Sequence, residues 1–387
     1  MGLAAERSGV ACACCDDRAR RAPQAIKTHA VAIVERGTTG NLAIFLKALL
    51  AHLAQRSYTY VMHEDLLQVL ATISKRVLDP LMLPSSRTFV GYLATSYLLA
   101  VVVHYVAHRN SESGRSPVRD IFPREVYTHR SAVVDYVYFI CNTTLGAIVL
   151  APFAGCGIVV SREVTTLLGG VPETGLAGGW LVTAMLTLVL VMVQDFATFL
   201  VHVCAHRVPW LWEFHKVHHS AEVMTPLTVY RMHPIDDALT FIVGGVLTGC
   251  TDALVRVYID PDFPVASLYG LTVFTFLFYL CGYNLRHSHV WVSWGPIVSR
   301  IFISPAQHQI HHSQARKHWN KNYGFMFAFW DYMFGSLYIP KERENVEFGI
   351  GNGEEKEYSS VLRLYFLPFA KASRRFRGRY PRKSGVD

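Results

Sequence analysis

The sequence predicts an all-α integral membrane protein, a helical bundle of about four to six spans. Apolar residues make up 51% of the 387 residues and charged residues only 17%, whereas a soluble domain carries about 25% charged residues. The mean hydropathy is +0.23. The apolar residues gather in runs of roughly 20 residues, the length that crosses a bilayer as a helix. This composition excludes intrinsic disorder, collagen and coiled coil as the class of the whole chain.

Five apolar runs are long enough to cross a bilayer: 89–107, 133–157, 180–201, 238–259 and 265–283. The last two are separated by the helix-breaking sequence DPDFP, so we expect them to form a helical hairpin. The apolar run 41–54 is short and carries Lys47, which predicts an interfacial helix or part of a sixth span. Residues 58–78 alternate apolar and charged side chains at helical spacing, which predicts a surface helix.

Composition divides the chain into four regions. Residues 1–40 form a polar tail that we expect to be disordered and that lacks the apolar stretch of a secretory signal. Residues 41–87 are expected to form amphipathic, interfacial helices. Residues 88–345 form the predicted membrane domain, and residues 346–387 form a basic C-terminal tail.

The surplus of positive charge lies outside the apolar runs, as is typical of a membrane protein. The chain has 37 Lys and Arg against 29 Asp and Glu, a net charge of +8, and the surplus lies in loops and in the C-terminal tail. This distribution favours a membrane surface or another anionic partner, and no nucleic acid is expected. Arginines follow the first apolar run, whereas the turn at 260–264 has no basic residue. The positive-inside rule therefore predicts that the ends of the first and third runs and the C-terminal region are cytoplasmic.

The histidines are clustered. Of 18 histidines, 12 lie after residue 200, and eight of these form one H-x3-H and two H-x2-H-H patterns: His202, His206, His215, His218, His219, His308, His311 and His312. Residues i, i+3 and i+4 share a face of a helix, so each pattern aims two or three imidazoles at one point. Neutral imidazoles crowded in this way need a shared cation to offset their lone-pair repulsion and desolvation. The patterns therefore predict a metal site.

The number and type of ligands narrow the choice of metal. Imidazole suits Zn, Cu, Fe and Ni, and a structural zinc site closes with four ligands. Eight or more histidines therefore imply two metals or a large redundancy, and two oxidisable irons that bind O2 between them fit this neutral set. A zinc protease would have Glu after the first histidine of its helical pair, whereas Val203 follows His202 here.

Other polar residues receive narrower predictions. Asp195 lies on the same helix face as His202 and His206, and we expect its carboxylate to accept the other ring N–H of a ligating histidine. His287 and His289 are two residues apart and point to opposite faces of a helix, so only one of them is expected to ligate. The remaining histidines of the membrane domain, His104, His108, His129 and His318, are expected to have no ligand role.

Taken together, these motifs resemble the fatty acid hydroxylase/sterol desaturase superfamily of membrane di-iron enzymes over roughly residues 180–340. The resemblance is carried by Asp195, H-x3-H at 202–206, LWEFHKVHHS at 211–220, RMHP at 231–234, LRHSH at 285–289, SPAQHQIHHS at 304–313, NKNYG at 320–324 and WDYMFG at 330–335. It implies a four-helix membrane core capped by a cytosolic, histidine-bound dimetal centre. The eight clustered histidines carry over as ligands, His287 matches the intermediate family histidine, and His233 matches a position that many members share. Asn320 departs from the family pattern, in which this position is often Asp.

The resemblance also implies O2-dependent hydroxylation or desaturation of a sterol, a fatty acyl chain or a related lipid. The implied cofactors are two Fe, with O2 as co-substrate and electrons from an external donor of the cytochrome b5, ferredoxin or reductase type. A strand–G-x-G-x-x-G–helix pattern for a nicotinamide or flavin cofactor is not found in the sequence, so the donor is expected to be a separate protein. Two other classes stay open: a histidine-rich membrane metal transporter, whose ligands would lie within the spans, and a non-catalytic lipid-binding homologue.

Overall fold

A computed structural model of the chain describes residues 68, 71–72, 74–109, 116–173, 175 and 179–377. The chain divides into two compact units, 1–72 and 73–387, and almost all described residues belong to the second. The predicted polar tail 1–40, the interfacial helix 41–54 and most of the surface helix 58–78 lie outside the described residues, as do the last ten residues.

Four stretches of the described chain are long and apolar enough to cross a membrane. Three are single helices: α3 (Val90–His108), α9 (Trp180–Arg207) and α11 (Pro234–Tyr258). The fourth, Arg130–Leu167, is interrupted. It consists of α6 (Arg130–Cys141), the π-helical turn η1 (Asn142–Gly146), α7 (Ala147–Leu150), the 3-10 turn η2 (Ala151–Phe153) and α8 (Cys156–Leu167). Four of the apolar runs predicted from the sequence therefore form helical stretches of membrane-spanning length.

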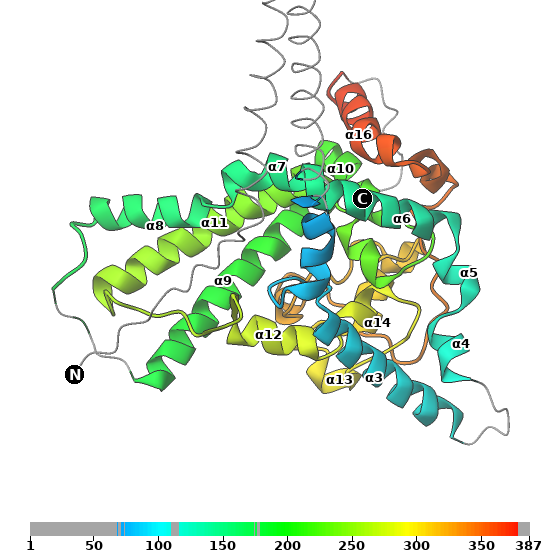
Figure 1. The fold of residues 1–387 in the computed structure, drawn as a ribbon, viewed down its shortest axis with the longest axis horizontal. Coiled ribbons are helices and arrows are strands. Elements are labelled where there is room, and N and C mark those ends of the chain that lie inside the picture. Colours follow the sequence, from blue (N-terminus) through cyan, green and yellow to red (C-terminus); the bar gives the residue numbers. More distant parts are fainter. Residues whose placement is uncertain are drawn as a thin grey trace, which may run out of the picture. The chain divides into compact units, whose positions relative to one another are not determined.

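Small residues let α8 approach α11 closely, and α9 lies along the other side of α11 (Figure 1). A Cβ atom added to Gly249 of α11 would lie 2.5 Å from the carbonyl oxygen of Gly157 of α8, and one added to Gly245 would lie 2.9 Å from the backbone nitrogen of Gly157. Only glycine permits this contact between the two backbones. Glycines four residues apart are a common way to pack membrane helices.

The fifth predicted span, 265–283, is wrong. Its first part is an antiparallel hairpin of β1 (Ser267–Leu268) and β2 (Leu271–Thr272), with Tyr269 and Gly270 in the turn at φ angles of 51° and 82°. Only α12 (Val273–Leu280) follows, and Gly282 ends it at a φ of 80°. A helix of 8 residues is about 12 Å long and cannot cross a hydrocarbon core of about 30 Å. Of the two spans expected in the helical hairpin, only the first is present, as α11.

The remaining elements are short and build the region around the clustered histidines. They are α4 (Pro117–Ile121), α5 (Arg124–Tyr127), α10 (Pro209–His219), η3 (Pro226–Tyr230), η4 (Tyr283–His287), α13 (Gly295–Val298), α14 (Pro305–His311), η5 (Arg316–His318), α15 (Phe329–Met333), η6 (Glu354–Tyr358) and α16 (Val361–Phe376). Sequence signals mark where the histidine-bearing helices begin. Pro209 is the first residue of α10, and Ser304 and Gln307 form a capping box at the start of α14.

A buried arginine holds the C-terminal end of α10 in place. Arg231 is 2% exposed and donates to the carbonyl of Val217, the hydroxyl of Ser220 and the carbonyl of Tyr358. Its Nη1 atom also lies 2.6 Å from a carboxylate oxygen of Asp135 in α6. These contacts join α6, α10 and the segment before α16.

The predicted basic tail contains a packed helix. α16 lies against α10, where the rings of Phe369 and Phe214 meet edge to face with centroids 5.1 Å apart (Figure 1). Glu354 accepts from Lys216 of α10 at 2.6 Å and from Lys371 of α16 at 2.9 Å. Residues 361–376 therefore support the outer side of α10, which carries histidines on its inner side.

Candidate metal centre

Histidines from four separate segments meet at one place. α9 ends with His202 and His206, α10 carries His215, His218 and His219, η4 ends with His287, and α14 carries His308, His311 and, at its C-cap, His312. They form two neighbouring groups: a four-histidine group and a five-histidine group. Within each group, one nitrogen of every ring lies within 4.8 Å of the others.

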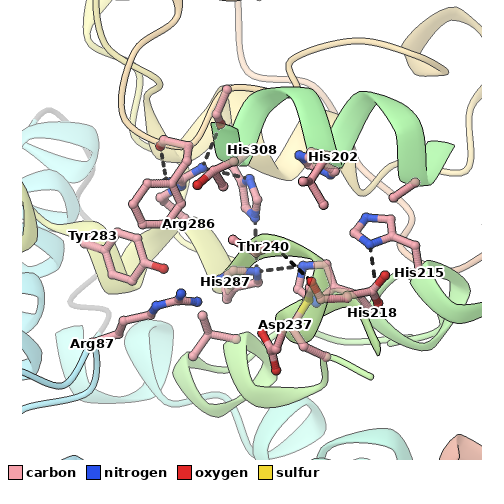
Figure 2. Close-up of a pocket in the computed structure, with 18 residues that line it drawn as sticks. Arg87, His202, His215, His218, Asp237, Thr240, Tyr283, Arg286, His287 and His308 are labelled. Atoms are coloured by element: carbon pink, nitrogen blue, oxygen red, sulfur yellow. Dashed lines mark hydrogen bonds and ion pairs between the residues drawn. The ribbon is translucent and has the colours of Figure 1, made fainter. Parts of the chain in front are cut away.

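The four-histidine group consists of His218, His287, His308 and His312. The Nε2 atom of His308 lies 3.0 Å from that of His287 and 3.2 Å from that of His312, and the Nε2 atoms of His287 and His218 are 3.4 Å apart. Figure 2 shows three of these rings in a row. Two facing nitrogens share at most one proton, so four converging Nε2 atoms cannot satisfy one another by hydrogen bonds alone.

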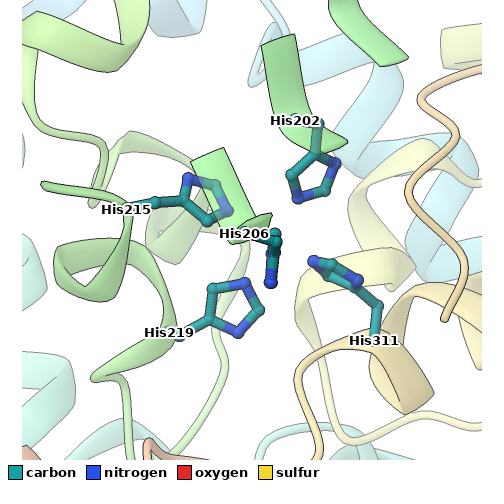
Figure 3. Close-up of side chains that lie close together, drawn as sticks. All are labelled: His202, His206, His215, His219 and His311. Carbon is teal, nitrogen blue, oxygen red and sulfur yellow. The ribbon is translucent and has the colours of Figure 1, made fainter. Parts of the chain in front are cut away.

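The five-histidine group consists of His202, His206, His215, His219 and His311. Their rings surround a common space (Figure 3), and the ring centroids of His202 and His311 are 4.5 Å apart. The Nε2 atoms of all five are buried and have no hydrogen-bond partner among the described residues. A buried polar atom without a partner is costly, so five of them facing one space are suited to binding a cation.

The two groups are interleaved along the sequence. In α10, His215 and His219 belong to the five-histidine group, and His218 belongs to the four-histidine group. In α14 and its cap the division is reversed, because His308 and His312 belong to the four-histidine group and His311 to the five-histidine group. The two groups touch where the ring of His219, from the five-histidine group, stacks on the ring of His312, from the four-histidine group, with centroids 4.5 Å apart.

Backbone carbonyl groups orient two rings of the five-histidine group. The Nδ1 atom of His202 donates to the carbonyl of Tyr323 at 2.7 Å, and that of His311 donates to the carbonyl of Lys321 at 2.8 Å. A ring that donates through Nδ1 keeps a lone pair on Nε2, which is the tautomer that a metal requires. The loop 320–327 therefore sets the direction of both lone pairs.

Asp195 contacts this loop, in place of the histidine that we expected. Its carboxylate accepts from the backbone nitrogens of Met326 at 2.7 Å and Phe327 at 3.1 Å, and from the indole nitrogen of Trp330 at 3.0 Å. Asp195 precedes His202 by seven residues, about 10 Å along the helix axis, so the two side chains share a face but not a level. The loop fills the space beside Asp195, and the same loop carries the carbonyl that accepts from His202.

Two charged residues beside the histidines were not assigned a role from the sequence. An oxygen of Asp236 lies 3.8 Å from Nδ1 of His215, and neither oxygen of this buried carboxylate has a hydrogen-bond partner in the described part of the chain. Arg286 is 2% exposed and donates to Nδ1 of His308 at 3.0 Å and to the carbonyl of Phe325. A neutral His308 that accepts through Nδ1 carries its proton on Nε2, so this contact must be released before Nε2 can bind an ion. Asp236 follows the RMHP motif by two residues, and Arg286 precedes His287, so their positions beside motif residues were the available signal.

Two other histidines of the motifs lie outside both groups. His233 caps α11 by accepting from the backbone nitrogen of Ile235 at 3.1 Å, and its Nε2 atom donates to the carbonyl of Tyr365 at 3.1 Å. Both ring nitrogens of His233 are therefore used, and the structure does not bring this predicted ligand to the other histidines. His289 donates through Nε2 to the carbonyl of Asp120 at 2.8 Å. Of the pair His287 and His289, only His287 reaches a group, because a 3-10 turn ends there.

Burial keeps these imidazoles neutral. It lowers the pKa of His215 to about 3. Burial, and next the charge of a neighbouring imidazole or of Arg286, lowers the pKa values of the other grouped histidines outside the spans well below the usual 6.5: His218, His219, His287, His308, His311 and His312. Neutral rings offer lone pairs at pH 7. The donor set of four and five neutral nitrogens fits two transition-metal ions, with Fe, Zn, Cu and Ni as suitable elements.

Two cavities lie beside the histidines. The smaller, of about 110 Å³, is lined by His202, His215, His218, His287 and His308 and, farther away, by Arg87, Asp237, Thr240 and Tyr283 (Figure 2). The larger, of about 570 Å³, is lined mainly by apolar side chains such as Leu277, Phe278 and Met326. Tyr283 and Arg286 line both cavities. An apolar chamber is thus separated from the metal-facing space by two polar side chains.

Helices of membrane-spanning length with two groups of buried histidines near their ends are typical of integral-membrane metalloproteins of the histidine-cluster type. Residues 187–336, which include all nine grouped histidines, match the fatty acid hydroxylase family. This region is therefore similar to the fatty acid hydroxylase/sterol desaturase superfamily, in agreement with the resemblance carried by the motifs.

Curated relatives agree with this assignment. The chain is 27% identical over 174 residues to an alkylglycerol monooxygenase of Caenorhabditis elegans, an alignment that covers 45% of this chain and 31% of the relative. It is 26% identical over 184 residues to the ornithine lipid hydroxylase OlsE of Rhizobium tropici, covering 48% and 50%. It is 26% identical over 162 residues to the Delta(7)-sterol 5(6)-desaturase of Eremothecium gossypii, covering 42% and 40%. The chain thus spans a third to a half of the length of these relatives, and no solved structure matches it.

Proposed function

We propose that this protein is an O2-dependent lipid hydroxylase whose nine grouped histidines hold two irons. The observation that carries the proposal is the pair of adjacent histidine groups, whose buried nitrogens converge in the described structure without enough hydrogen-bond partners. Two of the three relatives named above are a monooxygenase and a hydroxylase, and the third is a desaturase. Hydroxylation is therefore preferred to desaturation.

The proposed reaction balances with an external donor. One atom of O2 enters a lipid C–H bond to give an alcohol, and the other leaves as water with two electrons and two protons. When bound, the two irons would supply the reduction of O2 and the oxidation of the C–H bond. The electrons come from a separate protein of the cytochrome b5, ferredoxin or reductase type. The arginines after the first span support a metal centre on the cytoplasmic side, where such donors are found.

The chain's own residues bind the metals, orient the rings and exclude water. The carbonyls of Tyr323 and Lys321 orient His202 and His311, and Asp195 holds the loop that carries these carbonyls. The apolar cavity of about 570 Å³ is suited to part of a lipid chain, since ligand pockets commonly measure about 300–1,000 Å³ and are mainly apolar. Holding the chain there would place one carbon near the metal-facing space and select the C–H bond by position.

The test uses the full chain, purified in detergent and reconstituted with iron and a reducing system. We expect about two irons per chain, oxygen consumption that depends on added membrane lipid, and a lipid product heavier by 16 mass units. His311→Ala and His218→Ala remove one ligand from each group and should both abolish oxygen consumption and lower iron content without preventing membrane insertion. His129→Asn is the matched control, because His129 caps α6 and asparagine is also a good cap.

The outcomes separate the alternatives. A product lighter by 2 mass units would show desaturation. Metal transport into vesicles without oxygen consumption would identify a transporter, and lipid binding without turnover in the iron-loaded protein would identify a non-catalytic homologue. Full activity in His311→Ala or His218→Ala would reject the assignment of ligands.

A further inference from the structure

A third cluster of metal-ligating side chains lies outside the nine-histidine centre. His104 and His108 are one turn apart on α3, and Asp120 lies in α4. An Nδ1 atom of His104, an Nε2 atom of His108 and a carboxylate oxygen of Asp120 lie within 4.8 Å of one another. The sequence analysis expected no ligand role for either histidine, although their spacing, i and i+4, is the same as that of His202 and His206.

The backbone fixes the tautomer of His108. Its Nδ1 atom lies 2.9 Å from the carbonyl oxygen of His104, and only a protonated nitrogen can make this contact. The neutral ring therefore carries its lone pair on Nε2, which lies 3.9 Å from a carboxylate oxygen of Asp120. A histidine that donates its other ring N–H to a carbonyl is the usual arrangement of a metal ligand.

His104 presents a buried nitrogen that lacks a hydrogen bond. Its side chain is 6% exposed, and its Nδ1 atom lies 3.1 Å from an oxygen of Asp120. At this distance the direction is nevertheless wrong for a hydrogen bond, so Nδ1 has no hydrogen-bond partner among the described residues. Two ligands of one tetrahedral ion, at bonds of about 2.0–2.2 Å, are about 3.3 Å apart. The separations of 3.1 and 3.9 Å lie on either side of this value.

We propose that His104, His108 and Asp120 bind a divalent cation of the zinc type. Two neutral imidazoles and one carboxylate are a common set of three protein ligands for zinc, which leaves a fourth position for water. His108 and Asp120 are each 33% exposed, so an ion can enter from solvent. The ion joins the C-terminal end of α3 to α4. It also fixes the residue whose carbonyl binds His289, two positions after the grouped His287.

The site is tested by counting metal ions in the full chain whose nine-histidine centre has first been loaded with iron. Zinc is then titrated in competition with a chromophoric chelator, and bound zinc and iron are measured by mass spectrometry. We expect one zinc per chain in addition to the iron. His108→Ala and the isosteric Asp120→Asn should weaken zinc binding at least about tenfold, since even residues that only orient a ligand contribute 10–100-fold.

Two further variants serve as controls for the zinc measurement. His129→Asn should keep the additional zinc, because His129 lies outside the cluster. His218→Ala should lose iron from the nine-histidine centre, and adding Asp120→Asn to it should remove one further zinc per chain, so failure of one site does not imply failure of the other. Wild-type protein that takes up no zinc beyond its iron, or equal zinc affinity in wild type and Asp120→Asn, would show that His104 and Asp120 form only an ion pair and would overturn the proposal.

Discussion

Asp195 offers a direct test of how the loop 320–327 orients the metal ligands. Its carboxylate is 3% exposed and accepts three hydrogen bonds, from Met326, Phe327 and Trp330. Asp195→Ala leaves three buried donors without an acceptor, at about 1–3 kcal/mol each. Part of this loss is offset because burying the carboxylate itself costs several kcal/mol. We therefore expect a net loss of about 3 kcal/mol in the free energy of unfolding.

The same substitution should affect the metal more than a general loss of stability would. Release of the loop removes the carbonyl of Tyr323 from Nδ1 of His202, and loss of such an orienting contact typically weakens metal binding by about 10–100-fold. The assay measures iron per chain by mass spectrometry at limiting iron, together with the melting temperature in detergent. Iron content should fall well below that of the wild type, and the melting temperature should fall by about 5 °C or more.

The control is Leu200→Ala, on the same helix at a position that is 39% exposed. It should change neither quantity by a comparable amount. Asp195→Asn should be intermediate, because the amide oxygen still accepts from one or two donors whereas its NH2 group faces another donor. Wild-type iron content in Asp195→Ala, with or without a lower melting temperature, would refute the argument that the aspartate orients His202 through the loop.

Three other predictions concern buried ionisable side chains. Arg231→Met should lower the free energy of unfolding by about 3–5 kcal/mol because it leaves the buried carboxylate of Asp135 unpaired; thermal denaturation measures this, and an undiminished loss after adding Asp135→Leu would contradict the explanation. Asp236→Asn should keep the fold and weaken metal binding about tenfold, since it removes the charge beside His215; equal affinity in a metal titration would exclude this role. In the metal-free protein, the folded pKa of His215 is lowered to about 3, so the unfolded chain binds more protons below about pH 6.5. The stability contributed by this histidine is fully present above that pH and is lost as the pH falls toward 3, by about 1.4 kcal/mol per pH unit. Melting curves of the metal-free protein between about pH 6 and 4.5 should show stability falling with pH, and His215→Gln should reduce the slope by about 1.4 kcal/mol per pH unit.

Helical periodicity predicted the grouping of the histidines well, because the H-x3-H and H-x2-H-H patterns lie on real helices. The same reasoning could not place Asp195, since its partners are backbone nitrogens of a loop 131 and 132 residues later in the chain. It could not divide the ligands between the two groups either, because that division depends on how α10 and α14 face each other.

Errors in the sequence analysis have particular causes. The run 265–283 is apolar enough for a span, but Tyr269, Gly270 and Gly282 adopt positive φ angles and break the helix. The proposed third partner of His104 and His108, Asp120, comes 12 residues after His108 and leaves no helical spacing pattern with them. His233 matched a shared motif position, yet its ring nitrogens serve the backbone of Ile235 and Tyr365. Hydropathy and spacing describe local structure, whereas these contacts are set by the tertiary fold.

Because the two histidine groups are interleaved along the sequence, α10 and α14 each contribute to both groups at once. Each helix supplies rings to both groups, and neighbouring residues such as His218 and His219 differ by about 100° around the helix axis. The distance between two ions bound by these groups would therefore be set by the pitch of two short helices and would not depend on domain motion. Neither helix can slide or rotate to suit one ion without displacing the other, so we expect both ions to be gained and lost together.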